Sequence, residues 1–376
     1  MAQNQTQTQS QQSASNIIPF RAGVRAFRQT LDTTQLSTFG ATGQRIKIAP
    51  VGYLHKLWLV LNGTIISGAG TINGAWASYP FLPYSLLSKI HLYATPGTDI
   101  INVSGDGLAQ LNAFARRNDI NSGIPLAQYG NTASLAQNYQ TNTGATVASH
   151  TYNFTAAWEL PISTDDSLMW GLLPIANESV LVNLELTLAN LNQLSTETGV
   201  TMTPSFTASV VQESFVPLTN ISLPNGQPAV VAQPDLRFLH KIIETPQGIT
   251  NTGQNRYKPL IGPTYLRQFV INENNGAQMT PANINKVNYN FAAQSTLIDE
   301  PYAQHIDRVQ AYTGQYLPSG AVYLDWTNGQ GIEGVVDTRD MVNTIDQTDV
   351  NLQITYNTMS LTNAQMRVVE EYLTGM

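Results

Sequence analysis

The sequence contains no cysteine and few charged residues. With no cysteine among 376 residues, disulfides, thiolate zinc sites and cysteine nucleophiles are excluded. Lys, Arg, Asp and Glu together make up only 11% of the chain, which is less than half of the usual share. Hydrophobic residues reach 42%, enough to form real cores. A surface so poor in charge is expected where much of it is buried against other subunits.

Long apolar segments are missing too. Residues 1–15 are rich in Gln, Ser and Thr and lack the apolar region of a signal peptide. No apolar run approaches the ~20 residues that a membrane-spanning helix needs. We therefore expect synthesis in a cytoplasm.

Positive charge is scarce and scattered along the chain. There are 18 Lys and Arg residues against 25 Asp and Glu residues, and the formal net charge is −7. A protein that wraps nucleic acid needs a basic stripe that releases counterions. The sequence therefore predicts no direct contact with nucleic acid.

Catalytic and metal-binding motifs are also absent from the sequence. The five histidines never occur at a metal-ligand spacing such as His-x3-His, and we find no nucleophile elbow, P-loop or calcium-loop spacing. Asp106, Asp307, Asp337 and Asp340 could supply an acidic pair for glycoside cleavage, but nothing in the sequence singles them out. We predict no catalytic residue, no metal site and no cofactor.

What the sequence does contain is a repeat. Val182–Leu188 reads VNLELTL, and Val350–Tyr356 reads VNLQITY. Both segments alternate apolar and polar residues, which is typical of a strand with one buried face. The residues predicted to face a core are Val182, Leu184, Leu186, Leu188, Val350, Leu352, Ile354 and Tyr356.

Two further pairs of segments match in the same order. Residues 53–59 (YLHKLWL) resemble 265–271 (YLRQFVI), and residues 89–93 (KIHLY) resemble 286–290 (KVNYN). The separation between matched segments shrinks along the chain, so the first copy must have the longer loops. These matches predict an internal duplication.

The duplication suggests a division of the chain into four parts. We expect a polar tail and a helix over 1–35, a first β domain over 36–216, a proline-rich linker over 217–234, and a second β domain over 235–376. The long polar segment 118–149 is predicted to be a projecting loop or an interaction surface of the first domain.

Helices are expected at corresponding places in the two domains and at the C-terminus. Residues 105–117 and 300–312 each follow a predicted strand and have helical character. A last helix is predicted from Thr362 to Leu373, because Thr-Asn-Ala-Gln resembles a capping box and Met366, Val369 and Leu373 are spaced for one helical face.

The segment from Ile17 to Leu31 is predicted to form an amphipathic N-terminal helix. At roughly 100° per residue, an apolar stripe lies beside a basic stripe, and no acidic residue precedes Asp32. Such a helix suits a lipid headgroup surface; alternatively, it packs under the chain's own domains with its arginines on carboxylates. The two stripes comprise Phe20, Val24, Phe27 and Leu31, and Arg21, Arg25 and Arg28.

These patterns predict an all-β fold of two tandem jelly-roll (β-sandwich) domains, with short inserted helices and N- and C-terminal helices. The sequence resembles the double jelly-roll major capsid proteins of tailless phages with an internal membrane, the tectivirus type. The resemblance rests on the Gln/Ala/Ser-rich N-terminus before an amphipathic helix, on two in-line β units, and on residues 163–190. There, STDDSL leads through LPIAN into VNLEL and then AN.

The resemblance implies a structural protein of the virion without enzymatic activity. It would be synthesised in the host cytoplasm and would form homotrimers of pseudo-hexagonal outline that tile an icosahedral shell over an internal membrane. Neighbouring capsomers, minor capsid or vertex proteins and inner-membrane lipids would be its partners. The physical logic agrees, because a trimer of a duplicated unit presents six similar β domains to a lattice.

Two other functions fit a β architecture. One is a phage adhesin, or a carbohydrate-binding or cell-wall hydrolase β-sandwich, which should show clustered exposed Trp and Tyr beside paired acids; the five Trp residues here are dispersed. The other is a virion vertex or spike protein, which does not require a duplication.

Overall fold

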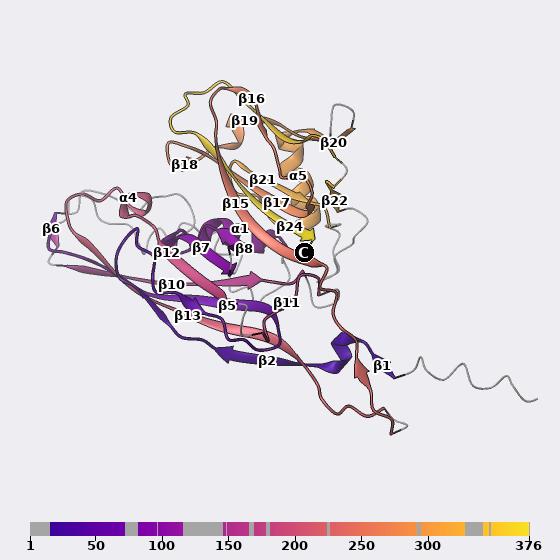
Figure 1. Cartoon of the computed structure of the whole chain (residues 1–376). Helices are drawn as coiled ribbons and strands as arrows, with labels where there is room; N and C mark the ends of the chain where they lie inside the picture. The colour runs from indigo at the N-terminus through magenta and orange to yellow at the C-terminus, as the bar shows by residue number, and fades with distance from the viewer. Residues whose placement is uncertain are drawn as a thin grey trace, which may run out of the picture.

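The computed structural model describes residues 16–71, 82–95, 97–115, 146–147, 149–164, 169–177, 181–223, 226–291, 295–327, 341–345 and 347–375. Within these residues the chain folds mainly into β-sheets, arranged as two jelly rolls (Figure 1). Most of the predicted loop 118–149, together with Asp337 and Asp340, lies outside the described residues.

The first jelly roll has two layers of four main strands. One layer contains, in spatial order, β2 (Val24–Thr30), β13 (Met202–Pro217), β5 (Tyr53–Ser67) and β10 (His150–Pro161). The other contains β4 (Ile46–Lys47), β12 (Val182–Leu188), β7 (Leu87–Ala94) and β8 (Thr98–Val103). β3 (Thr34–Leu36) pairs with β13, β11 (Leu173–Pro174) pairs with β5, and α1 (Gly105–Ala115) follows β8.

The second jelly roll repeats this order. Its first layer contains β15 (Phe238–Gly248), β24 (Gln365–Gly375), β17 (Thr264–Asn274) and β21 (Ala321–Asp325). Its second layer contains β16 (Gly253–Tyr257), β23 (Val350–Tyr356), β19 (Ile284–Phe291) and β20 (Ser295–Pro301). β22 (Val342–Asn343) and β18 (Ala277–Gln278) pair with β17, and α5 (Tyr302–Thr313) follows β20.

The remaining elements are short. β1 (Ile17–Ile18) pairs in parallel with β14 (Val230–Val231), and β6 (Gly70–Thr71) pairs with β9 (Thr146–Val147). The short helices are η1 (Phe20–Gly23), η2 (Tyr84–Leu86), α4 (Leu191–Leu194) and η4 (Pro281–Asn283). None of the helices in the described part of the chain has the length and apolar character needed to span a bilayer.

The repeated segments occupy the same place in the two rolls. β12 lies between β4 and β7, and β23 lies between β16 and β19. The match of 89–93 with 286–290 has the predicted register, because Leu92 is opposite Leu184 and Tyr289 is opposite Leu352. The chain therefore contains the same strand arrangement twice.

The eight residues predicted to face a core from these strands are all at most 3% exposed. A side chain of this size, fully buried, contributes about 1.5–3 kcal/mol relative to an exposed position. The alternation of apolar residues thus anchors one strand in the middle of a layer in each roll. The residues are Val182, Leu184, Leu186, Leu188, Val350, Leu352, Ile354 and Tyr356.

The predicted match between 53–59 and 265–271 is wrong by one residue. It places Tyr53 on Tyr265. In the structure, β13 pairs with Leu54 and Lys56 across a bulge, and β24 pairs with Tyr265 and Arg267 across an equivalent bulge, so Leu54 is the counterpart of Tyr265. The Tyr-Leu identity favoured the wrong register, whereas the pairing partners determine which side chain faces the core.

The predicted N-terminal helix is wrong. Residues 20–23 form a single 3-10 turn, and β2 then pairs along β13, with Arg28 opposite Glu213. The backbone groups of β13 need partners on that side, and an extended segment supplies them. This tertiary demand overrides a helical spacing that also occurs by chance in a short basic segment.

The predicted C-terminal helix is wrong as well. β24 lies in the middle of its layer, between β15 and β17. Seven consecutive or near-consecutive residues between Met366 and Leu373 are buried, including Val368 and Val369 on opposite faces. A strand buried on both faces loses the apolar-polar alternation, so periodicity does not distinguish it from a helix.

The two rolls share one continuous sheet. β8 of the first roll pairs in parallel with β15 of the second, with Ile101 opposite Ile242 and Asn102 opposite Ile243. This pairing joins a layer of each roll into a ten-stranded sheet (Figure 1). The relative position of the rolls is therefore set by backbone hydrogen bonds.

Candidate functional site

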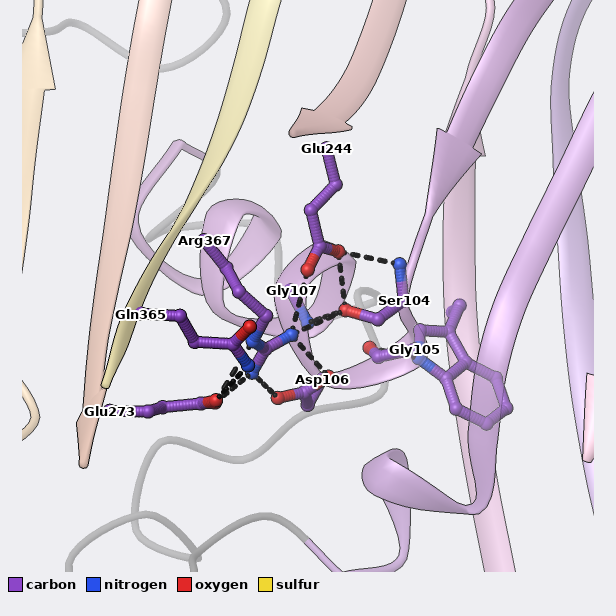
Figure 2. Close-up of polar contacts among 9 residues, drawn as sticks. Ser104, Gly105, Asp106, Gly107, Glu244, Glu273, Gln365 and Arg367 are labelled. Atoms are coloured by element: carbon purple, nitrogen blue, oxygen red, sulfur yellow. Dashed lines mark hydrogen bonds and ion pairs between the residues drawn. The ribbon is translucent and has the colours of Figure 1, made fainter. Parts of the chain in front are cut away.

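A buried arginine joins the two rolls. Arg367 of β24 is 2.6 Å from the Asp106 carboxylate of α1, 2.8 Å from Glu244 of β15 and 2.8 Å from Glu273 of β17. It also donates to Ser104 Oγ, at 2.9 Å. Figure 2 shows these side chains converging between the start of α1 and the second roll. One guanidinium thus connects Ser104 and Asp106 of the first roll to three strands of the second.

The cluster is polar but largely shielded from solvent, because the side chains of Arg367 and its three acidic partners are only 7–13% exposed. Burial opposes the charged form of Asp106, but the charge and hydrogen bonds of Arg367 outweigh it and hold the pKa of Asp106 below its usual value. Burial also opposes the charge on Arg367, and the three carboxylates raise its pKa well above the usual value. Both groups therefore stay ionised.

Further hydrogen bonds tighten the same contact. Glu244 accepts from the backbone N–H of Ser104 at 2.7 Å and from its hydroxyl at 2.5 Å. Gly107 leaves room for this approach, because a Cβ there would lie 2.9 Å from the Glu244 carboxylate and 3.0 Å from Val369. A side chain at this position would displace the Ser104 hydroxyl and the Glu244 carboxylate from their hydrogen bond.

Apolar contacts surround the polar cluster. Phe114 of α1 packs against Phe269 and Tyr323 of the second roll, with ring centroids 5.5 and 5.2 Å apart. Trp170 of the first roll lies on Phe238 at 5.7 Å. Every residue of α1 from Gly105 to Phe114 is buried. Helix α1 is therefore enclosed between the two rolls.

A second ionic cluster lies on the same face of the second roll. Arg267 donates to Glu371 at 2.9 Å and lies 3.6 Å from Asp325. Glu371 also contacts His240, at 3.0 Å. Burial disfavours the charged guanidinium, but the neighbouring carboxylates prevail and raise the pKa of Arg267.

Glu370 faces the interior of the second roll. Tyr257 and Gln268 donate hydrogen bonds to its two oxygens, each at 2.8 Å. Burial nevertheless dominates and raises the pKa of Glu370 from 4.5 to about 7. In the folded protein this carboxyl therefore titrates near neutral pH.

The residues of the predicted N-terminal stripes do not form a common face. Phe20 is buried against Tyr53 and Phe215, at 5.3 and 6.4 Å, and Leu31 lies in the main core. Arg28 pairs with Glu213 at 2.8 Å. Val24, Arg21, Arg25 and Phe27 remain partly or fully exposed. Three of these residues behave as in the alternative given above. Phe20 and Leu31 pack against the first domain, and Arg28 contacts a carboxylate.

The acids considered for glycoside cleavage are not brought together within the described residues. Asp106 is held by Arg367, and Asp307 lies on the exposed side of α5. Among the residues that the structure places, no group of three or more His, Asp or Glu side chains is arranged to hold a metal ion.

Sequence reasoning missed the residues that fasten the rolls. Arg367, Glu244 and Glu273 each lie within an apolar strand pattern, in a chain where charges are rare. A charge inside a core strand indicates a buried partner. The signal was present in the sequence, but it did not identify the partner.

Replacing Arg367 by methionine tests the polar junction. The change should lower the free energy of unfolding by about 3–5 kcal/mol, because three carboxylates would stay buried without their cation. Urea unfolding followed by circular dichroism measures this loss. Arg45→Met is the matched control: its exposed pair with Glu185 should contribute no more than about 1 kcal/mol. Equal losses in the two variants would contradict a stabilising role for the junction.

Replacing Glu370 by glutamine tests the raised pKa. Folded Glu370 keeps its proton to about pH 7, whereas the unfolded chain releases it near 4.5. The wild type therefore loses stability, relative to the always neutral variant, as the pH rises from 4.5 to about 7. The melting temperature of Glu370→Gln should exceed that of wild type increasingly over this range. Glu185→Gln is the control with the opposite sign, because Tyr93 and Arg45 lower the pKa of Glu185. Parallel pH profiles of Glu370→Gln and wild type would refute the interpretation.

Comparison with known proteins gives a consistent answer on the fold. No protein-family model and no curated protein sequence matches this chain. Among solved structures, the MCP of STIV (Sulfolobus turreted icosahedral virus) has a TM-score of 0.65 at 16% identity, covering 93% of this chain and 97% of that chain. VP54 of PBCV-1, fitted into a reconstruction of the virophage Sputnik, has a TM-score of 0.57 at 13% identity, covering 93% and 94%.

A phage protein also resembles the chain. The major capsid protein P2 of bacteriophage PM2 has a TM-score of 0.52 at 9% identity, covering 94% of this chain and 98% of that chain. Each of these alignments spans both jelly rolls. At such low identities they establish the architecture and do not transfer individual residues. The chain has the double jelly-roll fold of these viral major capsid proteins, as the sequence resemblance implied.

Proposed function

We propose that the protein is a major capsid protein, structural and not enzymatic, whose homotrimers tile an icosahedral shell. The observation that supports this most strongly is the duplication itself. Two rolls with the same strand order are fastened side by side by a shared sheet and a buried arginine. Three such chains would present six similar β domains, a near-hexagon suited to a lattice made from one gene product.

The structural neighbours support the same proposal. Three double jelly-roll proteins that align over more than nine-tenths of this chain are viral capsid proteins. An adhesin or hydrolase sandwich and a vertex or spike protein remain as alternatives, but neither explains the paired rolls. The partners in the proposed setting are neighbouring capsomers and minor capsid or vertex proteins, within the virion.

Measuring the mass of the purified protein tests this proposal. Light scattering should give about three times the chain mass of 41.0 kDa, and electron microscopy should show particles of hexagonal outline. A stable monomer at micromolar concentration would contradict the proposal. Glycan cleavage that is lost on replacing Asp106 or Asp307 would favour the hydrolase alternative instead.

We also propose that the shell lies over an internal membrane, which the chain contacts through its N-terminal part. The support is local charge: Arg21 and Arg25 are exposed, and no acidic residue precedes Asp32. A helix is not required, because exposed arginines on a turn and an edge strand can reach anionic headgroups equally well. Each arginine near such a surface contributes about 1 kcal/mol.

Co-flotation with anionic vesicles tests the membrane contact. Changing Arg21 and Arg25 to glutamine should weaken binding roughly 30-fold, the equivalent of about 2 kcal/mol. A variant with Arg45 and Lys258 changed to glutamine removes the same charge elsewhere and should float like wild type. If both double variants bind equally, the N-terminal arginines have no special role at the membrane.

A further inference from the structure

We propose that copies of this chain join by repeating, between molecules, the contact that already joins its two rolls. Strand β20 and helix α5 of one copy would dock on the β2 edge and the outer face of the first roll of the next. The inference rests on the proposed shell-forming function and specifies the surfaces and the strand register of its trimer.

Strand β20 has in the second roll the place that β8 has in the first. Ile101 lies opposite Leu92, and Ile298 lies opposite Tyr289, the counterpart of Leu92. A bulge follows one residue further along in both pairs. The two strands therefore correspond residue by residue, Ile101 to Ile298.

The last strands of the two rolls correspond in the same way. Glu213 of β13 pairs with Lys56, and Glu371 of β24 pairs with Arg267; each pair adjoins a bulge at the same place in the layer. The two glutamates are thus equivalent positions.

This equivalence identifies β2 as the counterpart of β15. Arg28 of β2 lies opposite Glu213, and Ile242 of β15 lies opposite Glu371. Within the chain, Ile242 is paired with Ile101 of β8. Repeating that pairing between two copies puts Arg28 opposite Ile298, and Gln29 opposite Asp299, in a parallel strand pair.

Both edges that this pairing needs lack a second strand within the described part of the chain. Among the described residues, β2 pairs only with β13, and β20 pairs only with β19. Ile100, beside the β8–β15 contact, is 0% exposed, whereas its counterpart Leu297 is 45% exposed. Phe27 on β2 is 39% exposed. Free edges with exposed apolar residues are ready to pair with another strand.

The outer face of the first roll is also more exposed than the corresponding face of the second roll. In the second roll, Phe269, Ile271 and Val369 are 0% exposed, in the layer that α1 covers. Their counterparts in the first roll carry apolar side chains that are only half-buried. These counterparts are Trp58, Val60 and Val211.

Helix α5 is the counterpart that fits this face. Helix α1 is buried from Gly105 to Phe114, whereas α5 buries only Tyr302, His305, Val309 and Thr313. One side of α5 is therefore exposed, with no layer over it among the residues that the structure places. Within one chain, α1 of the first roll packs on the outer face of the second roll. The outer face of the first roll and the exposed side of α5 are the two surfaces that would make the equivalent contact between copies.

Charge favours the same partner. Strand β2 has arginines and no acidic residue, whereas β20 carries Asp299 and Glu300. Asp299 and Glu300 already pair with Lys286 and Arg308 within the chain, so the charge effect that remains is repulsion between two arginine-bearing β2 strands, which disfavours pairing of β2 with itself. A second copy of the chain thus matches the β2 edge in register and in exposed apolar surface.

The buried ionic cluster of the internal contact has no equivalent between copies. Ser209 occupies the position of Arg367, and Thr30 occupies that of Glu244. Pro301, the last residue of β20, corresponds to Ser104, which follows β8. Contacts between copies would therefore lack the buried ionic cluster. We expect them to be reversible, while the two rolls of one chain stay together.

Engineered cysteines test the register, since the chain has none of its own. In the double variant Gln29→Cys/Asp299→Cys, the proposed pairing brings the two Cα atoms within disulfide reach. Mild oxidation should produce covalent species of two and three chains on a non-reducing gel, which disappear on reduction. Gln29→Cys/Ala277→Cys is the control, because Ala277 is exposed on the same roll but on β18, away from β20 (Figure 1).

The outcomes separate this inference from the proposed function. A native trimer whose Gln29→Cys/Asp299→Cys form cross-links no better than the control overturns the inference and leaves the shell proposal intact. A protein that stays monomeric at all concentrations overturns both. As a measurement independent of oxidation, Trp58→Lys should lower the mass from trimer to monomer while circular dichroism stays unchanged. A Trp58→Lys trimer as stable as wild type would count against the docking face.

Discussion

The parallel pairing of β8 with β15 is the contact on which the rest of the molecule depends. It turns two separate sandwiches into one body, and it places the start of α1 against the second roll. Arg367 then has to be there, because Asp106, Glu244 and Glu273 meet at that point and would repel one another without a cation. Gly107 completes the contact by leaving space for Glu244.

The two rolls have the same strand order, but equivalent elements differ in what they contact. Helix α1 is enclosed, while its counterpart α5 keeps an exposed side. β15 has partners on both edges, while its counterpart β2 has one among the described residues. A linear chain with two copies of a unit can satisfy the contact between units only once. In the proposed assembly the two remaining halves, β2 with its face and β20 with α5, would pair between copies head to tail.

Charged residues are rare in this chain, and several of the buried ones lie where the two rolls meet. The Arg367 and Arg267 clusters both lie on the side of the second roll that faces the first. The core of the second roll around Glu370 is otherwise rich in apolar and tyrosine side chains, and burial there raises the pKa of Glu370 to about 7 despite two hydrogen bonds. Below about pH 7 this carboxyl is protonated in the folded protein and needs no buried cation.

The sequence by itself determined the β class, the duplication and the strands 182–188 and 350–356, because an apolar residue at every second position can be buried only by a strand with one face on a core. It also located both inserted helices, which occur as α1 and α5. Only the tertiary structure decided the conformation of residues 20–31 and 362–373, whose sequences have helical spacing. Pairing with β13 makes most of the first segment extended, and pairing with β17 does the same for most of the second. The same holds for the one-residue register of β17 and for the partners of Arg367. Those depend on which strands lie side by side, and contacts between residues 94 to 261 positions apart, as in the Arg367 cluster, leave no local pattern in the chain.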